Sequence, residues 1–417
     1  MSAKKSMMVV ITVCISMLWG LSLATAKEKP IKIGALFVMS GKLGGYGKSG
    51  WQAIQLAVDE INAGGGILGR KINATIEDTK VKPEIGVQIA KKYILKNKVD
   101  FLIGPTASSV GLAVSDVARQ YKKILVVTQS ATDVLTGSQF HPYQFSVLSN
   151  ALMQSRSGAY VMADKPYKRW MCIGPDYSYG HSSWETFKAK LKELRPDVEI
   201  VGELFPKLMT ADYTPYINKL IEAKPDAVWS PLWGGDAVTF IKQALPFKLF
   251  DQVKFAFPVG ASQEVLVPVG KDMPVGIYMS ARYFFTTPDS GMNREFVKAY
   301  HDRFKEYPSY MAEESYAGVY FLKAAIERAG TTETEAIIAA VEREPLAWET
   351  PEGWKIMRKE DHLAVEDVVW GETIFSAEYG FAILKNVQSI QAEQICRTAE
   401  ELREIRANYE KRLKEGK

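Results

Sequence analysis

Strand-like and helix-like segments alternate along this chain of 417 residues, and the alternation occurs twice. In the first half, apolar runs predict strands at 31–39, 71–77, 100–104 and 124–128, and helical spacing predicts helices at 51–61, 84–96 and 109–121. After residue 145 the pattern restarts, with strands predicted at 170–174, 198–204, 227–231, 255–257 and 276–280 and helices at 183–194, 213–222 and 237–245. Such alternation implies parallel sheets covered by helices on both faces. The sequence therefore predicts an α/β fold with two Rossmann-like lobes of similar size.

The first 26 residues have the three parts of a secretory signal peptide. Lys4 and Lys5 precede an uncharged apolar run at 7–23, and Ala24-Thr25-Ala26 is a small-x-small cleavage pattern. An uncleaved membrane anchor is the alternative, since the run is nearly long enough to span a bilayer. We expect cleavage after Ala26 and a periplasmic mature protein.

The charge balance of the mature chain excludes a nucleic-acid partner. Without Lys4 and Lys5 it would carry 50 basic and 48 acidic residues, which leaves no electrostatic footprint for nucleic acid. Its two cysteines, Cys172 and Cys396, could pair in an exported protein, although Cys172 lies in an apolar run typical of a buried strand. We expect a monomer.

Signatures of catalysis are missing. The four histidines are scattered and form no HExxH pair, and no G-x-S-x-G motif or zinc-ligand spacing occurs. We therefore expect neither an enzyme nor a bound cofactor or metal. An exported α/β enzyme whose site is assembled from distant residues stays open as an alternative.

A glycine motif between the first predicted strand and helix has dinucleotide-binding spacing. Gly45, Gly47 and Gly50 form G-x-G-x-x-G. The loop at 40–50 is longer than the tight turn of that motif, and free nicotinamide cofactors are not expected outside the cytoplasm. We expect these glycines to let the loop bend close to a different ligand.

Two polar turns follow neighbouring predicted strands. The first, at 104–109, places Ser108 and Ser109 where a helix begins, and the second spans 128–132. Free backbone N–H groups and the helix dipole favour an anion at such a position. Simple N-capping by serine is the alternative. Because parallel strands end at the same edge, the two turns predict one polar ligand shelf.

Several short motifs, in order and spacing, resemble the periplasmic leucine/isoleucine/valine-binding proteins across residues 31–384. The motifs that carry the resemblance are 33–41, Tyr46-Gly47, 57–62, 64–69, Ile103-Gly104 with Ser108-Ser109, Ser130-Ala131-Thr132, Asp176 with Tyr179-Gly180, and Tyr316-Ala317. The resemblance implies two lobes joined by three hinge crossings. It places lobe 1 at 27–145 plus 282–348, lobe 2 at 146–281 plus 349–384, and a helical tail at 385–417.

The family resemblance also implies a site and a role. It assigns the ligand carboxylate to Ser108, Thr132 and the backbone of Ser130, and it places Tyr46, Tyr179 and Trp233 along the cleft. The expected ligand-binding set is Tyr46, Ala107, Ser108, Ser109, Ser130, Ala131, Thr132, Tyr177, Tyr179, Trp233 and Val259. The implied function is capture of a small amino acid, carboxylate or amide for an ABC importer, with its permease and ATPase subunits as partners. Presentation of the ligand to a membrane sensor is the alternative.

Two departures from the family pattern bear on the ligand. Val259 stands where the amino-acid binders have the carboxylate that pairs with the ligand ammonium, and Phe145-Ser146 stand where they have a basic residue at the first crossing. A buried ammonium without a partner would cost several kcal/mol. Asp176, Asp236 and Glu264 are the acids that could substitute. The rings expected near the cleft, Tyr46, Tyr177, Tyr179, Trp229, Trp233 and Tyr283, favour a ligand with an apolar or aromatic body.

Overall fold

A five-stranded parallel sheet forms the centre of lobe 1. The computed structural model describes residues 29–415, and the signal peptide predicted at 1–26 lies outside them. The strands are ordered β2-β1-β3-β4-β5. Their bounds are β1 Ile31–Phe37, β2 Ile72–Asp78, β3 Phe101–Gly104, β4 Leu125–Val127 and β5 Gln144–Ser146. Strands β3 and β4 are buried along their whole length, as expected for apolar runs in a parallel sheet with helices on both faces.

Two pairs of helices pack beside this sheet. Helix α1 (Gly44–Ala63) packs on α11 (Tyr310–Ala329), and α2 (Pro83–Lys92) packs on α3 (Ser108–Tyr121). Helix α10 (Gly291–Phe304) precedes α11 in the chain, and helix α12 (Thr334–Arg343) follows it.

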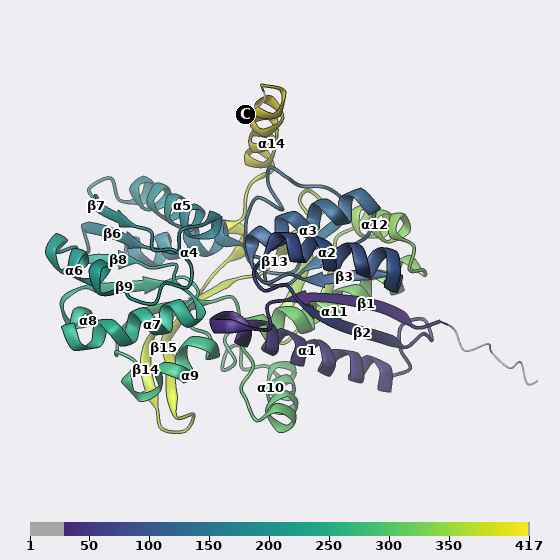
Figure 1. Cartoon of the computed structure of the whole chain (residues 1–417), viewed down its shortest axis with the longest axis horizontal. Coiled ribbons are helices and arrows are strands. Elements are labelled where there is room, and N and C mark those ends of the chain that lie inside the picture. Colours follow the sequence, from purple (N-terminus) through teal and green to yellow (C-terminus); the bar gives the residue numbers. More distant parts are fainter. Residues whose placement is uncertain (1–28, 416–417) are drawn as a thin grey trace, which may run out of the picture.

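Lobe 2 has a seven-stranded mixed sheet of order β15-β14-β10-β9-β8-β6-β7. Its parallel strands are β6 Arg169–Ile173, β7 Glu199–Leu204, β8 Ala227–Trp229, β9 Lys254–Phe257 and β10 Tyr278–Ala281. An antiparallel hairpin of β14 (Val368–Ser376) and β15 (Phe381–Ile390) extends the β10 edge. The helices of lobe 2 are α4 Ala151–Ala163, α5 Ser178–Leu194, α6 Thr214–Ala223, α7 Gly234–Ala244, α8 Leu249–Gln252 and α9 Gln263–Val269. Figure 1 shows the two lobes side by side.

The chain passes between the two large sheets after β5, after β10 and before β14. A small antiparallel sheet of β11 (Leu346–Thr350), β12 (Gly353–Met357) and β13 (Ala364–Val365) precedes the third passage. This sheet packs against α11, and a bridge joins Leu363 to Ser146 of β5. The sequence predicted that the chain returns to lobe 2 at residue 349. In the structure the chain joins the lobe 2 sheet only at Val368, the first residue of β14.

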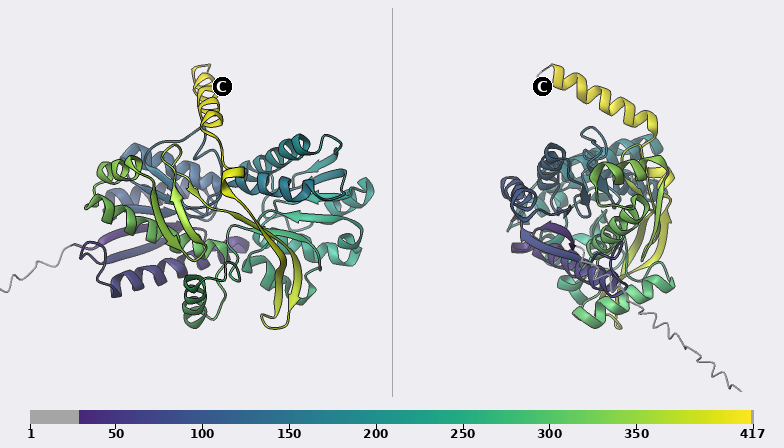
Figure 2. Two further views of the ribbon diagram at one scale, coloured as in Figure 1. Left: turned by 180° about the vertical axis from the view of Figure 1, so that it is seen from behind. Right: turned by 90° about the vertical axis from the view of Figure 1, so that its right-hand side faces the viewer.

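The C-terminal segment contains strand as well as helix. Strand β15 continues to Ile390, beyond the expected end of lobe 2 at residue 384. Helices α13 (Ala392–Ile395) and α14 (Ala399–Lys414) follow, and α14 stands away from the body (Figure 2). Its first turn is held by a capping box of Thr398 and Glu401 and by an ion pair from Arg156 to Glu401. Over residues 29–415, no helix is long and apolar enough to cross a membrane.

The glycine motif lies in a helix and not in a loop at the ligand. Residues 41–43 form a 3₁₀ turn and α1 begins at Gly44, so Gly47 and Gly50 are helical. A Cβ on Gly47 would lie 1.9 Å from the carbonyl oxygen of Val38, and one on Gly50 would lie 2.2 Å from Gln129 Nε2. The expectation that these glycines let a loop approach a ligand is therefore wrong: they let α1 approach the strand ends.

Both cysteines are buried free thiols. Cys172 lies within β6, as its apolar surroundings predicted, and Cys396 packs 3.8 Å from Met153 Sδ. Burial raises the pKa of both thiols.

Candidate functional site

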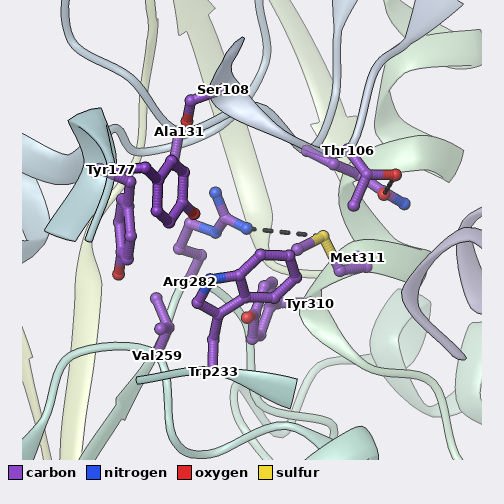
Figure 3. Close-up of a pocket in the computed structure, with 11 residues that line it drawn as sticks. Thr106, Ser108, Ala131, Tyr177, Trp233, Val259, Arg282, Tyr310 and Met311 are labelled. Atoms are coloured by element: carbon purple, nitrogen blue, oxygen red, sulfur yellow. Dashed lines mark hydrogen bonds between the residues drawn. The ribbon is translucent and has the colours of Figure 1, made fainter. Parts of the chain in front are cut away.

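A small cavity lies between the lobes (Figure 3). Side chains from both lobes and from the second crossing surround it. The lining residues are Thr106, Ser108, Gln129, Ala131, Tyr177, Tyr179, Trp233, Val259, Arg282, Tyr310 and Met311.

The lobe 1 wall is built by the two polar turns at the strand ends. Gly104 has a φ of +113°, and a Cβ there would lie 2.5 Å from the carbonyl oxygen of Leu36, so only glycine fits at the end of β3. Helix α3 begins at Ser108, where free N–H groups and the helix dipole favour a negative charge. Thr106 Oγ1 donates to Gln129 Oε1 at 2.7 Å, which joins the two turns into one shelf.

The lobe 2 wall is aromatic and apolar. Tyr177 and Tyr179 lie at the start of α5 with ring centroids 6.1 Å apart, and Trp233 precedes α7. Val259 follows β9 and is buried. Among the described residues, the Tyr179 hydroxyl is buried without a hydrogen-bond partner. Burial raises the pKa of Tyr179, so its hydroxyl stays protonated and can donate.

Arg282, which follows β10 at the second crossing, brings a positive charge into the cavity (Figure 3). Its Nε lies 2.8 Å from Glu314 Oε1, and its guanidinium lies 4.5 Å from the Tyr310 ring centroid. Nη2 contacts Met311 Sδ at 3.6 Å, while Nη1 has no hydrogen-bond partner among the described residues. Burial opposes the charge, but Glu314, Tyr310, Glu366 and Tyr179 together outweigh burial and raise the pKa of Arg282.

The sequence interpretation missed five lining residues as site residues: Thr106, Gln129, Arg282, Tyr310 and Met311. The family pattern has a basic residue at the first crossing, and here the basic residue of the cavity comes from the second crossing. A basic residue directly after a buried strand, at an expected crossing, was the signal that could have identified Arg282.

The structure brings six of the eleven expected site residues to the cavity: Ser108, Ala131, Tyr177, Tyr179, Trp233 and Val259. The expected residues outside the lining are Tyr46, Ala107, Ser109, Ser130 and Thr132. The Tyr46 hydroxyl accepts the Gly234 N–H at 2.9 Å, behind Trp233. Ser130 Oγ donates to the Ala107 carbonyl at 3.5 Å, and Thr132 Oγ1 accepts the Val134 N–H at 3.4 Å. These polar groups therefore stabilise the turns and closed form.

The acids proposed to replace the missing carboxylate do not line the cavity. Asp176 pairs with His181 on the surface, and Asp236 Oδ2 accepts the Met209 N–H at 2.7 Å. Glu264 is bound by serines of lobe 1. Two of the expected rings are core residues: Trp229 stacks on Phe187 at 3.9 Å, and the Tyr283 hydroxyl donates to Asn293.

Replacement of Ser108 by alanine is expected to raise the Kd for a carboxylate ligand about tenfold, because one donor at the positive end of α3 is lost. Thr132→Ala is the matched control, since Thr132 contacts its own turn and does not line the cavity. Titration calorimetry should show a change of less than twofold for Thr132→Ala. Equal losses in both variants would contradict the assignment of the shelf to Ser108.

Two α/β lobes joined by three crossings, with a cavity between them, form the architecture of a protein that binds a small molecule. The profile of the family described as "Periplasmic binding protein" matches residues 30–374. The chain belongs to this family of ABC-transporter solute-binding proteins.

Individual relatives agree with this assignment. Leu/Ile/Val-binding protein homolog 4 of Brucella abortus (strain 2308) is 26% identical over 387 residues, with 87% of this chain and 90% of the relative covered. A periplasmic binding protein from Burkholderia mallei has a similar fold, with a TM-score of 0.81, 21% identity, and 90% and 98% of the two chains covered. A solute-binding protein of an ABC transporter from Rhodopseudomonas palustris BisB5, solved with 3,4-dihydroxybenzoic acid, has a TM-score of 0.79 and 24% identity, with 87% and 98% covered.

Proposed function

We propose that this protein captures, in the periplasm, a small carboxylate that has an aromatic or apolar body and no ammonium group. It then delivers this ligand to an ABC importer of the membrane, which consists of permease and ATPase subunits. One observation carries the choice of ligand: the cavity contains the cation Arg282 and no carboxylate side chain among its lining residues.

Charge favours an anionic head group. Arg282 offers Nη1 to the cavity, and the start of α3 with Ser108 adds a partial positive charge from the opposite lobe. An α-amino acid would bring its ammonium into the same small space. Glu314 is already 2.8 Å from Arg282, and Val259 stands at the position of the family's ammonium partner. An unpaired ammonium would therefore cost several kcal/mol.

Shape favours a single ring or a short chain. The cavity encloses little free space, and its walls include Tyr177, Tyr179, Trp233 and Tyr310. Aromatic faces suit a flat apolar body, while the unpartnered hydroxyl of Tyr179 suits a polar substituent. The Rhodopseudomonas relative bound to 3,4-dihydroxybenzoic acid supports this class, whereas the name of the Brucella relative supports branched-chain amino acids.

Titration calorimetry can separate the two ligand classes. We expect benzoate or 3,4-dihydroxybenzoate to bind with micromolar or lower Kd, and leucine, isoleucine and valine to bind at least a hundredfold more weakly. Benzamide serves as a matched control for the charge, since it keeps the ring and loses the anion; it should bind weakly. Tight binding of leucine without response to any carboxylate that lacks an amine would contradict the proposal.

A further inference from the structure

Glu264 belongs to α9 of lobe 2, but two of its hydrogen-bond partners belong to lobe 1. Its Oε1 lies 2.8 Å from Ser49 Oγ in α1 and 2.9 Å from Ser309 Oγ, the residue that precedes α11. Ser49 has one hydroxyl hydrogen, and Glu264 is its nearest acceptor, since the Tyr46 carbonyl lies 3.1 Å away. These three residues are called the seam contact below.

A second bond crosses the same seam. Ser262, two residues before Glu264, lies 3.1 Å from the Tyr46 hydroxyl of lobe 1. The loop at the start of α9 therefore binds lobe 1 twice. Opening of the lobes would separate each pair, as it would the Gly234–Tyr46 and Lys42–Thr210 hydrogen bonds between the same lobes.

Closure takes the Glu264 carboxylate out of water. Its Oε2 is buried without a hydrogen-bond partner among the described residues, and burial raises the pKa of the carboxyl. Such desolvation is unfavourable unless hydrogen bonds offset it. The hydroxyls of Ser49 and Ser309 are thus the lobe 1 groups that offset the burial of Glu264, beside Ser262 and the Glu264 backbone N–H from lobe 2.

We propose that Glu264, Ser49 and Ser309 are positioning residues that set ligand affinity by stabilising the closed form. The inference rests on the proposed function for its ligand, but the contact itself touches no ligand. Because the ligand is held in the closed form, loss of the contact shifts the bound protein toward the open form and lowers affinity without altering the cavity wall. The loss should appear mainly as faster dissociation.

Variants of Glu264 test the contact with 3,4-dihydroxybenzoate as the probe. We expect Glu264→Ala to raise the Kd about tenfold to a hundredfold and the dissociation rate by a similar factor, with the association rate within threefold of wild type. Glu264→Gln keeps an acceptor oxygen for both serines and should stay within about threefold of the wild-type Kd. Stopped-flow fluorescence and calorimetry measure these quantities.

The serine side of the seam gives an independent test. The double variant Ser49→Ala/Ser309→Ala should raise the Kd about tenfold or more, and adding Glu264→Ala should cost less than its effect in the wild type, because the bonds are already gone. Glu306→Gln is the matched control: Glu306 pairs with Lys48 at 2.6 Å near the seam, but both residues belong to lobe 1 and are about half exposed. It should leave the Kd unchanged.

The outcomes separate the two proposals. Wild-type Kd and dissociation rate in Glu264→Ala and in the serine variant would overturn the seam contact. If the wild type binds leucine and no carboxylate, the proposed ligand class fails, and the same variants measured with leucine then test the seam contact.

Discussion

Replacement of Arg282 by glutamine is expected to raise the Kd for a carboxylate ligand by about 30-fold to several thousandfold. Loss of one partner of a buried, hydrogen-bonded charge pair costs about 2–5 kcal/mol of binding free energy. Arg282 is 1% exposed and is the single cation among the residues that line the cavity. The start of α3 contributes only a partial charge and cannot replace it.

The same substitution also lowers stability, because Glu314 would lose its partner. Both side chains are buried, and removal of one member of a buried pair costs about 3–5 kcal/mol. The double variant Arg282→Gln/Glu314→Gln removes both charges with nearly constant volume. We expect it to recover most of the melting temperature and none of the binding, which separates loss of affinity from loss of folding.

Glu314→Gln is the matched control for the charge. It retains the guanidinium and releases it from its carboxylate, so carboxylates should bind at least as tightly as to the wild type. Weaker binding in Glu314→Gln together with unchanged binding in the double variant would show that Arg282 does not hold the ligand. Calorimetry and thermal unfolding on the same samples decide between these results.

The second large effect is expected at Lys355, whose replacement by methionine should lower the free energy of unfolding by about 3–5 kcal/mol at pH 7. Lys355 Nζ lies 2.9 Å from Glu352 and 3.5 Å from Glu313, forms an ion pair with Glu366, and donates to the Val147 carbonyl at 3.3 Å. The buried ammonium therefore joins α11, the first crossing and the segment before the third crossing.

The loss should depend on pH. Burial raises the pKa of Glu313 and Glu352, and although burial opposes the charge of Lys355, its carboxylate neighbours raise the pKa of the lysine. A carboxyl with a raised pKa binds a proton on folding, so its contribution to stability is complete below about pH 4.3 and is lost as the pH rises. Without the lysine, the buried carboxyls must bind one more proton on folding. The free energy of unfolding of the variant therefore falls by about 1.4 kcal/mol more than that of the wild type for each unit by which the pH rises.

Urea unfolding at pH 5, 7 and 8 measures this dependence. The difference between wild type and Lys355→Met should grow from pH 5 to pH 8. Lys323→Met is the control, because Lys323 pairs with Glu327 at 2.8 Å on the exposed side of α11 and should cost less than about 1 kcal/mol. A loss at Lys355 that is small or independent of pH would contradict an ionised buried cluster.

The region that contains Lys355 shows where hydrophobic periodicity misleads. In β12, Lys355 is buried, while Trp354 and Ile356 on either side are 66% and 45% exposed. Periodicity alone assigns the apolar residues to the inside. The ion pairs with Glu313, Glu352 and Glu366 hold Lys355 inside, so its apolar neighbours face outward. These partners lie up to 42 positions away or in another element.

The sequence was sufficient to predict those strands and turns that depend on residues close together in the chain. The apolar runs of β1, β3 and β4 and the serine at the start of α3 predicted buried parallel strands and a polar edge, and the structure has both. The five expected residues that do not reach the cavity lie within one or two positions of residues that do, or directly behind them, as Tyr46 lies behind Trp233. The alternation of strands and helices identifies the turn, but it does not identify which side chain of the turn faces the cavity.

The sequence by itself determined the two α/β lobes, their parallel strands and the polar turn at Ser108, because each depends on the spacing of residues within one or two elements. Only the tertiary structure decided that Arg282 and Tyr310 face Ser108 and Trp233 across one cavity, and that Glu264 binds Ser49 rather than a ligand. These residues come together through the crossings and closure of the lobes. Contacts between segments so far apart in the chain leave no periodic trace in the sequence.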